Sequence, residues 1–316
     1  MSAAEQAIAR QLEALRRALG PQILGYLEDP TVIEIMLNPN GSLWIDVLGG
    51  SMQCVGSVTP VSALQIVNTV AAMMNRVVTS EDPILECELP IDGSRFEALI
   101  PPLVERASFA LRKKALLIFT LDDYVQKGIL KSEQKICIEK AIVERQNILV
   151  AGGTGTGKTT LANAIIDSAS KIDAEHRYVV IEDTRELQVS APNTVFLRTS
   201  ENIDMTCLLR ATMRLRPDRI VVGEVRDGSA LALLKAWNTG HPGGVGTVHA
   251  NDAPAALIRI GQLITEAVKE PQSELIAEAV NLVISIKRTA TGRIIDEIVQ
   301  VDGWSQATGF KVTTIG

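Results

Sequence analysis

The sequence predicts an α/β protein in which a P-loop domain with a parallel-rich sheet follows a smaller α+β domain. From residue 147 onward, short apolar strands alternate with helices, a pattern typical of a parallel sheet covered by helices. A glycine-rich phosphate-binding motif directly follows the first of these strands. Residues 31–114 instead hold short strands in hairpin-like succession. A chain of 316 residues is long enough for both domains.

The first domain is expected over residues 1–114 and begins with an amphipathic helix rather than a signal peptide. The apolar residues at helical spacing are Ile8, Leu12, Leu15 and Leu19. This stripe is expected to pack on its own domain or on a neighbouring subunit, with contact to a membrane surface as the alternative. The further elements are strands over 31–38, 42–48, 51–58, 94–101 and 107–112, and a helix over 60–75 capped by Thr59.

A linker is predicted over residues 115–131 and the P-loop domain over 132–316. The strands expected in this domain are 147–151, 178–182, 219–225 and 244–250. The helices are expected to begin at Ser132 and to lie near 158–170, 227–238, 253–267 and 272–280. A terminal hairpin is expected around the turn at Thr291 and Gly292.

The composition argues against several classes of protein. A net charge of −6, a pI near 5.3 and 3% aromatic residues give no strong sign of direct nucleic-acid binding, which usually needs a basic surface and aromatic platforms. No apolar run approaches the roughly 18 residues of a transmembrane segment. The scattered cysteines form no CxxC pair, so reduced core thiols of a cytoplasmic protein are expected at Cys54, Cys87, Cys137 and Cys207.

The motif GGTGTGKT at residues 152–159 fits G-x-x-x-x-G-K-[ST] and lies between a strand and a helix. Backbone N–H groups of residues 153–157 can surround a phosphate at the helix N-terminus, whose dipole favours negative charge. Lys158 would reach the β and γ oxygens of ATP, and Thr159 would hold Mg²⁺. The predicted nucleotide-binding residues are Gly153, Thr154, Gly155, Thr156, Gly157, Lys158, Thr159 and Thr160.

Hydrolysis also needs a carboxylate that positions or activates water. Glu182 and Asp183 end one strand beside the loop, and Glu224 lies near the end of another. The carboxyl ends of parallel strands are where such sheets bind ligands, so these residues are catalytic candidates. The alternative is that they cap the following helices, as expected for Asp227.

The stretch TGHPGGVGTVHAND at residues 239–252 carries His241, His249 and four glycines. Paired histidines can ligate a metal, move a proton or contact a phosphate. A metal site would need a third and usually a fourth ligand, and only Asp252 is near in sequence. A purely structural role for both histidines is the other alternative.

In this order, four motifs resemble those of the type II/type IV secretion traffic ATPases, a RecA-like P-loop family. They are GGTGTGKTT (152–160) as Walker A, VVIEDTREL (179–187) as the Asp box, RPDRIVVGEVR (216–226) as Walker B and TGHPGGVGTVHAND as the His box. The chain is most similar to the conjugal-transfer branch, because its N-terminal domain is short and it lacks the CxxC zinc module of some type II export enzymes. It departs from the general Walker B pattern in having Gly223 where many P-loop ATPases have aspartate.

The resemblance implies roles for the candidate residues. In the family pattern, a carboxylate of the Asp box polarises water, and Glu224 acts at both the metal and the nucleophile. The His box lies beside the γ-phosphate, so His249 is expected to sense the nucleotide state. His241 belongs to the same motif and is a nucleotide-binding candidate, with the alternative that it organises the loop, because it precedes the glycines. Its glycines are expected to let the loop change shape.

The resemblance also implies that arginines of the N-terminal domain reach the nucleotide. Arg112 and Arg106 are the preferred candidates, with Arg95 nearby, and each could equally be a solvated surface charge. A second basic set contains Arg226 and the residues Arg210, Arg214 and Arg216 before Walker B. Arg210 and Arg214 are expected to share one face of a helix.

The functional hypothesis is a cytoplasmic, Mg²⁺-dependent ATPase that works as a homohexameric motor of conjugative type IV secretion. The family pattern places ATP between the two domains and associates the ring peripherally with inner-membrane components of the secretion channel. A pilus extension or retraction ATPase is the main alternative within the superfamily. A nucleotide-gated assembly scaffold with little hydrolysis is another, and the acidic pI argues against a DNA-translocating motor.

Overall fold

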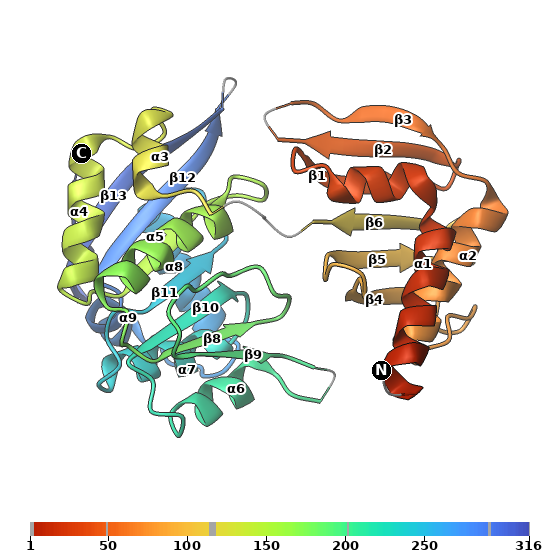
Figure 1. The fold of residues 1–316 in the computed structure, drawn as a ribbon. Coiled ribbons are helices and arrows are strands. Elements are labelled where there is room, and N and C mark those ends of the chain that lie inside the picture. Colours follow the sequence, from red (N-terminus) through yellow and green to blue (C-terminus); the bar gives the residue numbers. More distant parts are fainter. Residues whose placement is uncertain (1–2, 49, 114–117, 201, 290–291, 316) are drawn as a thin grey trace. The chain divides into compact units, whose positions relative to one another are not determined.

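The computed structural model describes residues 3–48, 50–113, 118–200, 202–289 and 292–315, which form two compact units over 1–116 and 117–316 (Figure 1). Within the described part of the chain, no helix has both the length and the apolar character that a membrane span requires. The elements of the first unit are α1 (Ala3–Glu28), β1 (Val32–Leu37), β2 (Ser42–Val47), β3 (Gln53–Ser57), α2 (Pro60–Met73), β4 (Ile84–Glu88), β5 (Arg95–Leu99) and β6 (Ser108–Arg112).

The first unit is an antiparallel sheet in the order β3-β2-β1-β6-β5-β4 that packs against α1 and α2. Leu15 and Leu19 of α1 are buried in this core, which confirms that the stripe packs on its own domain, whereas Ile8 is exposed. The helix bends at Gly20 and Pro21, because Gly20 has a φ of 72° and proline removes a backbone donor. Thr59 caps α2 as expected.

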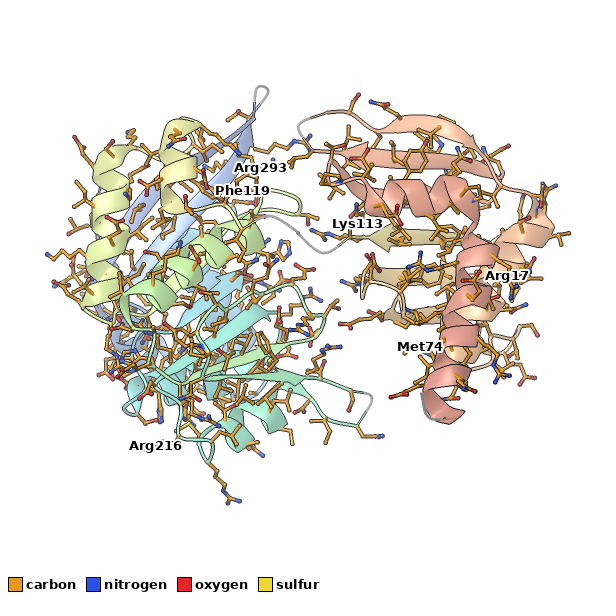
Figure 2. The ribbon with its side chains drawn as sticks, in the orientation of Figure 1. Arg17, Met74, Lys113, Phe119, Arg216 and Arg293 are labelled. Carbon is orange, nitrogen blue, oxygen red and sulfur yellow. The ribbon has the colours of Figure 1, made fainter. Side chains whose placement is uncertain are left out.

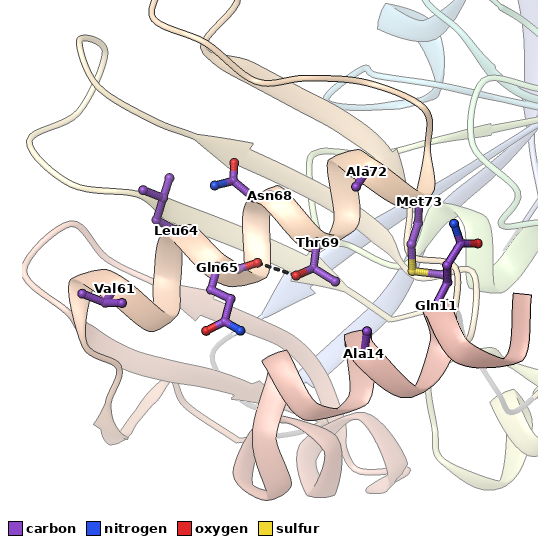
Figure 3. A pocket seen from close by; sticks show the side chains of 9 residues that line it. All are labelled: Gln11, Ala14, Val61, Leu64, Gln65, Asn68, Thr69, Ala72 and Met73. Carbon is purple, nitrogen blue, oxygen red and sulfur yellow. Dashed lines mark hydrogen bonds between the residues drawn. The ribbon is translucent and has the colours of Figure 1, made fainter. Parts of the chain in front are cut away.

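A groove of about 670 Å³ lies between α1 and α2 (Figure 3). Its lining residues are Gln11, Ala14, Val61, Leu64, Gln65, Asn68, Thr69, Ala72 and Met73. The polar groups partly satisfy one another, since the Thr69 hydroxyl donates a hydrogen bond of 2.7 Å to the backbone oxygen of Gln65. The lining includes no charged side chain, so the groove lacks the cations that a phosphate chain requires.

The second unit contains an eight-stranded sheet in the order β14-β13-β12-β7-β11-β10-β8-β9. The run from β12 to β9 is parallel, and β13 and β14 are antiparallel additions. The elements are α3 (Leu121–Gln126), α4 (Ser132–Val143), β7 (Ile148–Ala151), α5 (Lys158–Ile172), β8 (Tyr178–Glu182), β9 (Thr194–Arg198), α6 (Met205–Thr212), β10 (Arg219–Val225), α7 (Ser229–Asn238), β11 (Val245–Val248), α8 (Ala253–Ile264), α9 (Ser273–Ala279), β12 (Leu282–Thr289), β13 (Gly292–Ser305) and β14 (Gly309–Thr314).

Helices cover both faces of this sheet, as the alternation of strands and helices predicts (Figure 1). Along β7, Leu149 and Ala151 point into a core shared with α6 to α9, whereas Ile148 and Val150 point into a core shared with α3 to α5. Because β7 is buried on both faces, it reads as an uninterrupted apolar run. This central strand positions the glycine-rich loop that follows it.

Several elements differ from expectation. The stretch 115–131, expected as linker, contains α3, whose Leu121 and Tyr124 are buried in the core of the second unit. The helix before Walker B ends at Thr212, so Arg214 lies in a turn beyond it and does not share a helical face with Arg210. Hydrogen bonds from residue i to i−3 tighten that turn, and the proline at 217 follows it.

The cysteines are free, but the expectation of core thiols is wrong for two of them. Cys54 and Cys207 are exposed, while Cys87 and Cys137 are partly buried. Burial raises the pKa of the Cys87 thiol to about 11, so this group stays protonated near neutral pH.

Candidate nucleotide-binding site

The glycine-rich loop connects β7 to α5 and has a backbone that requires glycine. Gly155 and Gly157 have φ values of 69° and 100°, which side chains disfavour. A Cβ on Gly152 would lie 2.6 Å from the backbone oxygen of Ile286, so a side chain there would collide with β12. Gly157 has no side chain to cap α5, so the first N–H groups of that helix are available to an anion.

Two side chains fold back over the loop. The Thr156 hydroxyl donates a 2.9 Å hydrogen bond to the backbone oxygen of Gly153, and Lys158 Nζ donates to the same oxygen at 3.1 Å. Lys158 is buried, while Thr159 and Thr160 are half-buried in the first turn of α5 and Thr154 is exposed. The loop thus combines glycines that no other residue could replace with a lysine held across it. This arrangement fits the phosphate chain of ATP.

Glu224 lies on β10 and contacts two basic groups. Its Oε2 accepts hydrogen bonds from Arg226 Nε at 2.7 Å and lies 2.6 Å from Nη2, and its Oε1 lies 2.7 Å from His249 Nε2. Within the described residues, no donor is aligned on the buried Oε1. Glu224 is thus held by Arg226 at one carboxylate oxygen and lies within ion-pair distance of His249 at the other.

His249 follows β11 and joins this carboxylate to the loop lysine. Its Nδ1 and Nε2 lie 3.3 and 3.4 Å from Lys158 Nζ. Burial lowers the pKa of His249, Glu224 raises it and Lys158 lowers it further, with a net shift downward. The imidazole is therefore neutral near pH 7 and lies between an ammonium and a carboxylate.

Glu182 and Asp183 differ in their surroundings. Glu182 is buried, and its Oε1 accepts hydrogen bonds from the backbone N–H groups of Glu186 and Leu187 at 2.9 and 2.8 Å. Burial raises the pKa of Glu182, although the two hydrogen bonds oppose that shift. Asp183 is more exposed, accepts a hydrogen bond from the Thr199 hydroxyl at 2.9 Å and lies 3.8 Å from Arg226 Nη1.

The structure explains the glycine at position 223. A Cβ there would lie 3.1 Å from Cγ of Glu182 and 3.3 Å from its Oε1. The space beside position 223 on β10 is thus filled by the Glu182 side chain from the neighbouring strand β8. A side chain at 223 would therefore press on Glu182, which would have to shift by a few tenths of an ångström.

Asn163 on α5 is a site residue that the sequence analysis missed. Its Nδ2 donates to the backbone oxygen of Glu186 at 3.1 Å, and its Oδ1 accepts from the N–H of Gln188 at 2.9 Å. The side chain is buried and fastens the loop after Asp183 to the helix that begins with Lys158. The signal was a single amide within the apolar run LANAII.

His241 lies elsewhere in this chain, contrary to its expected place among the nucleotide-binding residues. It precedes β11, whereas His249 follows that strand, and β11 runs parallel to β7. Four strand residues at roughly 3.3 Å each separate the two edges by about 13 Å. His241 Nδ1 lies 3.3 Å from the backbone oxygen of Ala236 at the end of α7. Its place indicates that it organises the loop after α7.

The glycines next to His241 also have a packing role, and the expected change of loop shape stays a prediction. A Cβ on Gly243, whose φ is 84°, would collide with the guanidinium of buried Arg219. A Cβ on Gly244 would collide with the indole of Trp237. Close approach of large side chains therefore requires both glycines.

The metal alternative for the two histidines gains no support. Asp252, the third ligand considered, is the N-cap of α8 and accepts a 2.7 Å hydrogen bond from the N–H of Ala255. The part of the chain that the structure describes has no group of three or more His, Cys, Asp or Glu that could hold a metal. Mg²⁺ at a nucleotide normally takes one or two protein ligands beside phosphate and water, so Thr159 and Glu224 remain its candidates.

The candidate arginines of the first unit lie on or near its central strands. Arg112 on β6 is half-exposed and its Nε lies 3.5 Å from Glu34 Oε1. Arg106 is exposed in the segment before β6. Arg95 on β5 is the cross-strand partner of Arg112 and pairs with Glu86 at 3.0 Å. Their expected contact with nucleotide remains a prediction.

The parallel sheet, its glycine-rich loop and the charged residues beside that loop define a P-loop nucleotide-binding protein. Residues 22–303 match the family model described as type II/IV secretion system protein, and the chain belongs to this family. It is 50% identical to the probable conjugal transfer protein TrbB of Sinorhizobium fredii, over 93% of this chain and 90% of that protein. It is 30% identical to the type IV secretion system protein VirB11 of Bartonella henselae, over 83% and 86% of the two chains.

Solved structures show the same fold at lower sequence identity. The pilus retraction motor PilT with bound ADP aligns with a TM-score of 0.62 and 19% identity, over 93% of this chain and 81% of that one. The Legionella pneumophila ATPase DotB aligns with a TM-score of 0.61 and 19% identity, over 86% of this chain and 77% of that one. The expected architecture, a P-loop α/β domain after an N-terminal antiparallel sheet domain, is confirmed.

Proposed function

We propose that the chain is a Mg²⁺-dependent ATPase that drives conjugative type IV secretion. The observation that carries the proposal is the cluster of Lys158, His249 and Glu224 beside the glycine-rich loop. The similarity to TrbB conjugal transfer proteins over more than nine-tenths of the chain supports conjugation rather than pilus retraction as the process served.

In this proposal the loop N–H groups and Lys158 bind the phosphate chain and neutralise its charge. Mg²⁺, when bound through Thr159 and Glu224, would polarise the terminal phosphoryl group. Glu224 would orient the attacking water, with Glu182 and Asp183 as the further carboxylates. Neutral His249 has one N–H donor and one acceptor nitrogen. It would donate to the terminal phosphate and so report on the presence of that group.

We further propose that the chain assembles into a homohexamer on the cytoplasmic side of the inner membrane, peripherally attached to components of the secretion channel. Similarity to the VirB11 proteins supports a secretion-system context. In the ring, Arg112 or Arg106 of the first unit would complete the nucleotide site. The ring would adopt one of two functional states, depending on whether the terminal phosphate is present at His249.

The test is phosphate release by the purified full chain over a range of protein concentrations, beside Glu224→Gln. We expect specific activity to rise with concentration, because subunits must associate to complete the site. We expect Glu224→Gln to bind ATP but to lose at least about a hundredfold in turnover. Background release from a wild-type protein that binds ATP would contradict the motor and support the nucleotide-gated scaffold.

A further inference from the structure

The terminal hairpin β12–β13 borders the glycine-rich loop. Strand β12 pairs with β7 in parallel up to Ser285 and Ala151, which precedes the loop. The next residue of β12, Ile286, approaches Gly152. The predicted turn at Thr291 lies outside the described residues. The chain continues antiparallel to β12 in β13, and Arg293 is near its start (Figure 2). Since β12 and β11 flank β7, Arg293 comes from the side of the loop opposite to His249.

Arg293 lies along the backbone of this loop. Its Nη2 donates a long hydrogen bond of 3.4 Å to the backbone oxygen of Gly155. Its Cδ and Nε are each 3.4 Å from the position of a Cβ on Gly157. The side chain thus lies along the part of the loop that contains Gly155 and Gly157, the two glycines with positive φ, directly before α5.

The guanidinium is poorly satisfied by the protein itself. Its Nε is buried and has no hydrogen-bond partner within the described residues. The same residues offer it no carboxylate within ion-pair distance, and its cross-strand partner on β12 is a second cation, Arg288. A guanidinium with an unused buried donor favours an anion with oxygens in the plane of its fork.

We propose that Arg293 is a nucleotide-binding residue that contacts the phosphate chain from the hairpin side of the loop. This inference rests on the proposed function, because it needs a nucleotide in the glycine-rich loop. The weak bond to Gly155 is easily exchanged for a charge-assisted one. Lys158 and Arg293 would then hold the phosphates from two sides, which links nucleotide occupancy to the C-terminal hairpin.

The test is calorimetric binding of ADP and of pyrophosphate to the full chain and to three variants. We expect Arg293→Gln to weaken both ligands about tenfold or more, because the lost contacts are to phosphate. Arg293→Lys should lose less, since it keeps the charge without the planar fork. Arg288→Gln is the matched control: it removes the same charge from the exposed position across the hairpin and should leave both affinities within twofold.

Each other outcome overturns a defined statement. Unchanged affinity in Arg293→Gln would overturn the inference, as would an equal loss in Arg288→Gln, which would indicate general electrostatic attraction. Loss of ADP affinity with pyrophosphate unaffected would place Arg293 at the base or ribose instead. A wild-type chain that binds neither ligand would overturn the proposed function itself. Unfolding midpoints without nucleotide verify folding, and Arg293→Lys decides the matter if Arg293→Gln does not fold.

Discussion

The parallel strands begin at one side of the sheet, here called the amino edge, and end at the other side, the carboxyl edge. Each of these two edges holds a guanidinium, but in different surroundings. At the amino edge, the buried guanidinium of Arg219 donates to the backbone oxygens of Gly243 and Ile142 and pairs with Asp173. At the carboxyl edge, Arg293 Nε has no partner within the described residues, and Glu224 Oε1 lies 2.7 Å from His249 Nε2. The Arg219 guanidinium is satisfied by the protein alone, although Arg145 Nε and Tyr178 Oη at the same edge have no partner within the described residues. The carboxyl edge differs in holding Lys158, His249 and Glu224 beside the glycine-rich loop.

The contrast divides the His box between the two edges. Gly243 and Gly244, with Asn147 accepting the N–H of Gly244 at 2.9 Å, belong to the amino edge. His249 belongs to the carboxyl edge. We therefore expect substitutions at the amino edge to lower stability. We expect substitutions at the carboxyl edge to lower nucleotide affinity or turnover.

Lys158→Ala should have the largest effect at the carboxyl edge. Removal of an ammonium that contacts phosphate deletes charge-assisted hydrogen bonds, so we expect ATP affinity to fall at least about a hundredfold. Calorimetric titration measures this change, with the thermal midpoint of the free variant as the check on folding. Retention of wild-type affinity would show that the loop does not bind the nucleotide through Lys158.

Gly243→Ala should have the largest effect at the amino edge. Its Cβ would collide with Arg219 and its φ is 84°, so we expect the free energy of unfolding to fall by about 2 to 4 kcal/mol. Gly240→Ala is the matched control: its φ is 93° but its Cβ would meet open space, and we expect a loss of about 1 kcal/mol. Chemical denaturation compares them, and equal losses would contradict the packing role of Gly243.

His249→Ala should reduce turnover about tenfold while ATP affinity stays within a few-fold, because it loses a contact to the terminal phosphate only.

The pKa of His249 is below its usual value near 6.5, so protonation requires more acid and adds a second cation beside Lys158. The wild-type rate should therefore decline only as pH falls below that value. A decline that begins above pH 6.5 and disappears in His249→Ala would contradict this assignment.

Arg112→Ala should have the smallest effect on stability. Its contact with Glu34 is half-exposed, and such pairs contribute less than about 1 kcal/mol. If Arg112 completes the nucleotide site of an assembled ring, turnover should still fall about tenfold or more. Phosphate release at saturating protein concentration decides, with Arg95→Ala on the neighbouring strand as the comparison. Unaltered hydrolysis would remove Arg112 from the site.

The glycine-rich loop could be predicted from the sequence because its residues are contiguous and its spacing is fixed by one phosphate. The relation between Gly223 and Glu182 could not, because it depends on the pairing of β10 with β8. The edge strands β4, β9 and β14 were missed, since half-exposed strands such as ILECE carry a weak apolar pattern.

His241 is a different case, because the information was present. The strand over 244–250 was predicted correctly, and a strand between two histidines places them at opposite edges of the sheet. The expected alternative, that His241 organises the loop before the glycines, agrees with this placement. Arg293 carried no signal of its own, since its position beside the loop depends on how the terminal hairpin joins β7.

Hydrogen exchange with and without ADP tests the central contrast most directly. We predict that ADP slows exchange of the amides at residues 153–160, whose N–H groups lie at the start of α5, and leaves residues 240–244 unchanged. Protection confined to the carboxyl edge would confirm that this edge binds the nucleotide while the amino edge serves as scaffold. Equal protection at residues 240–244, or none at 153–160, would contradict the account.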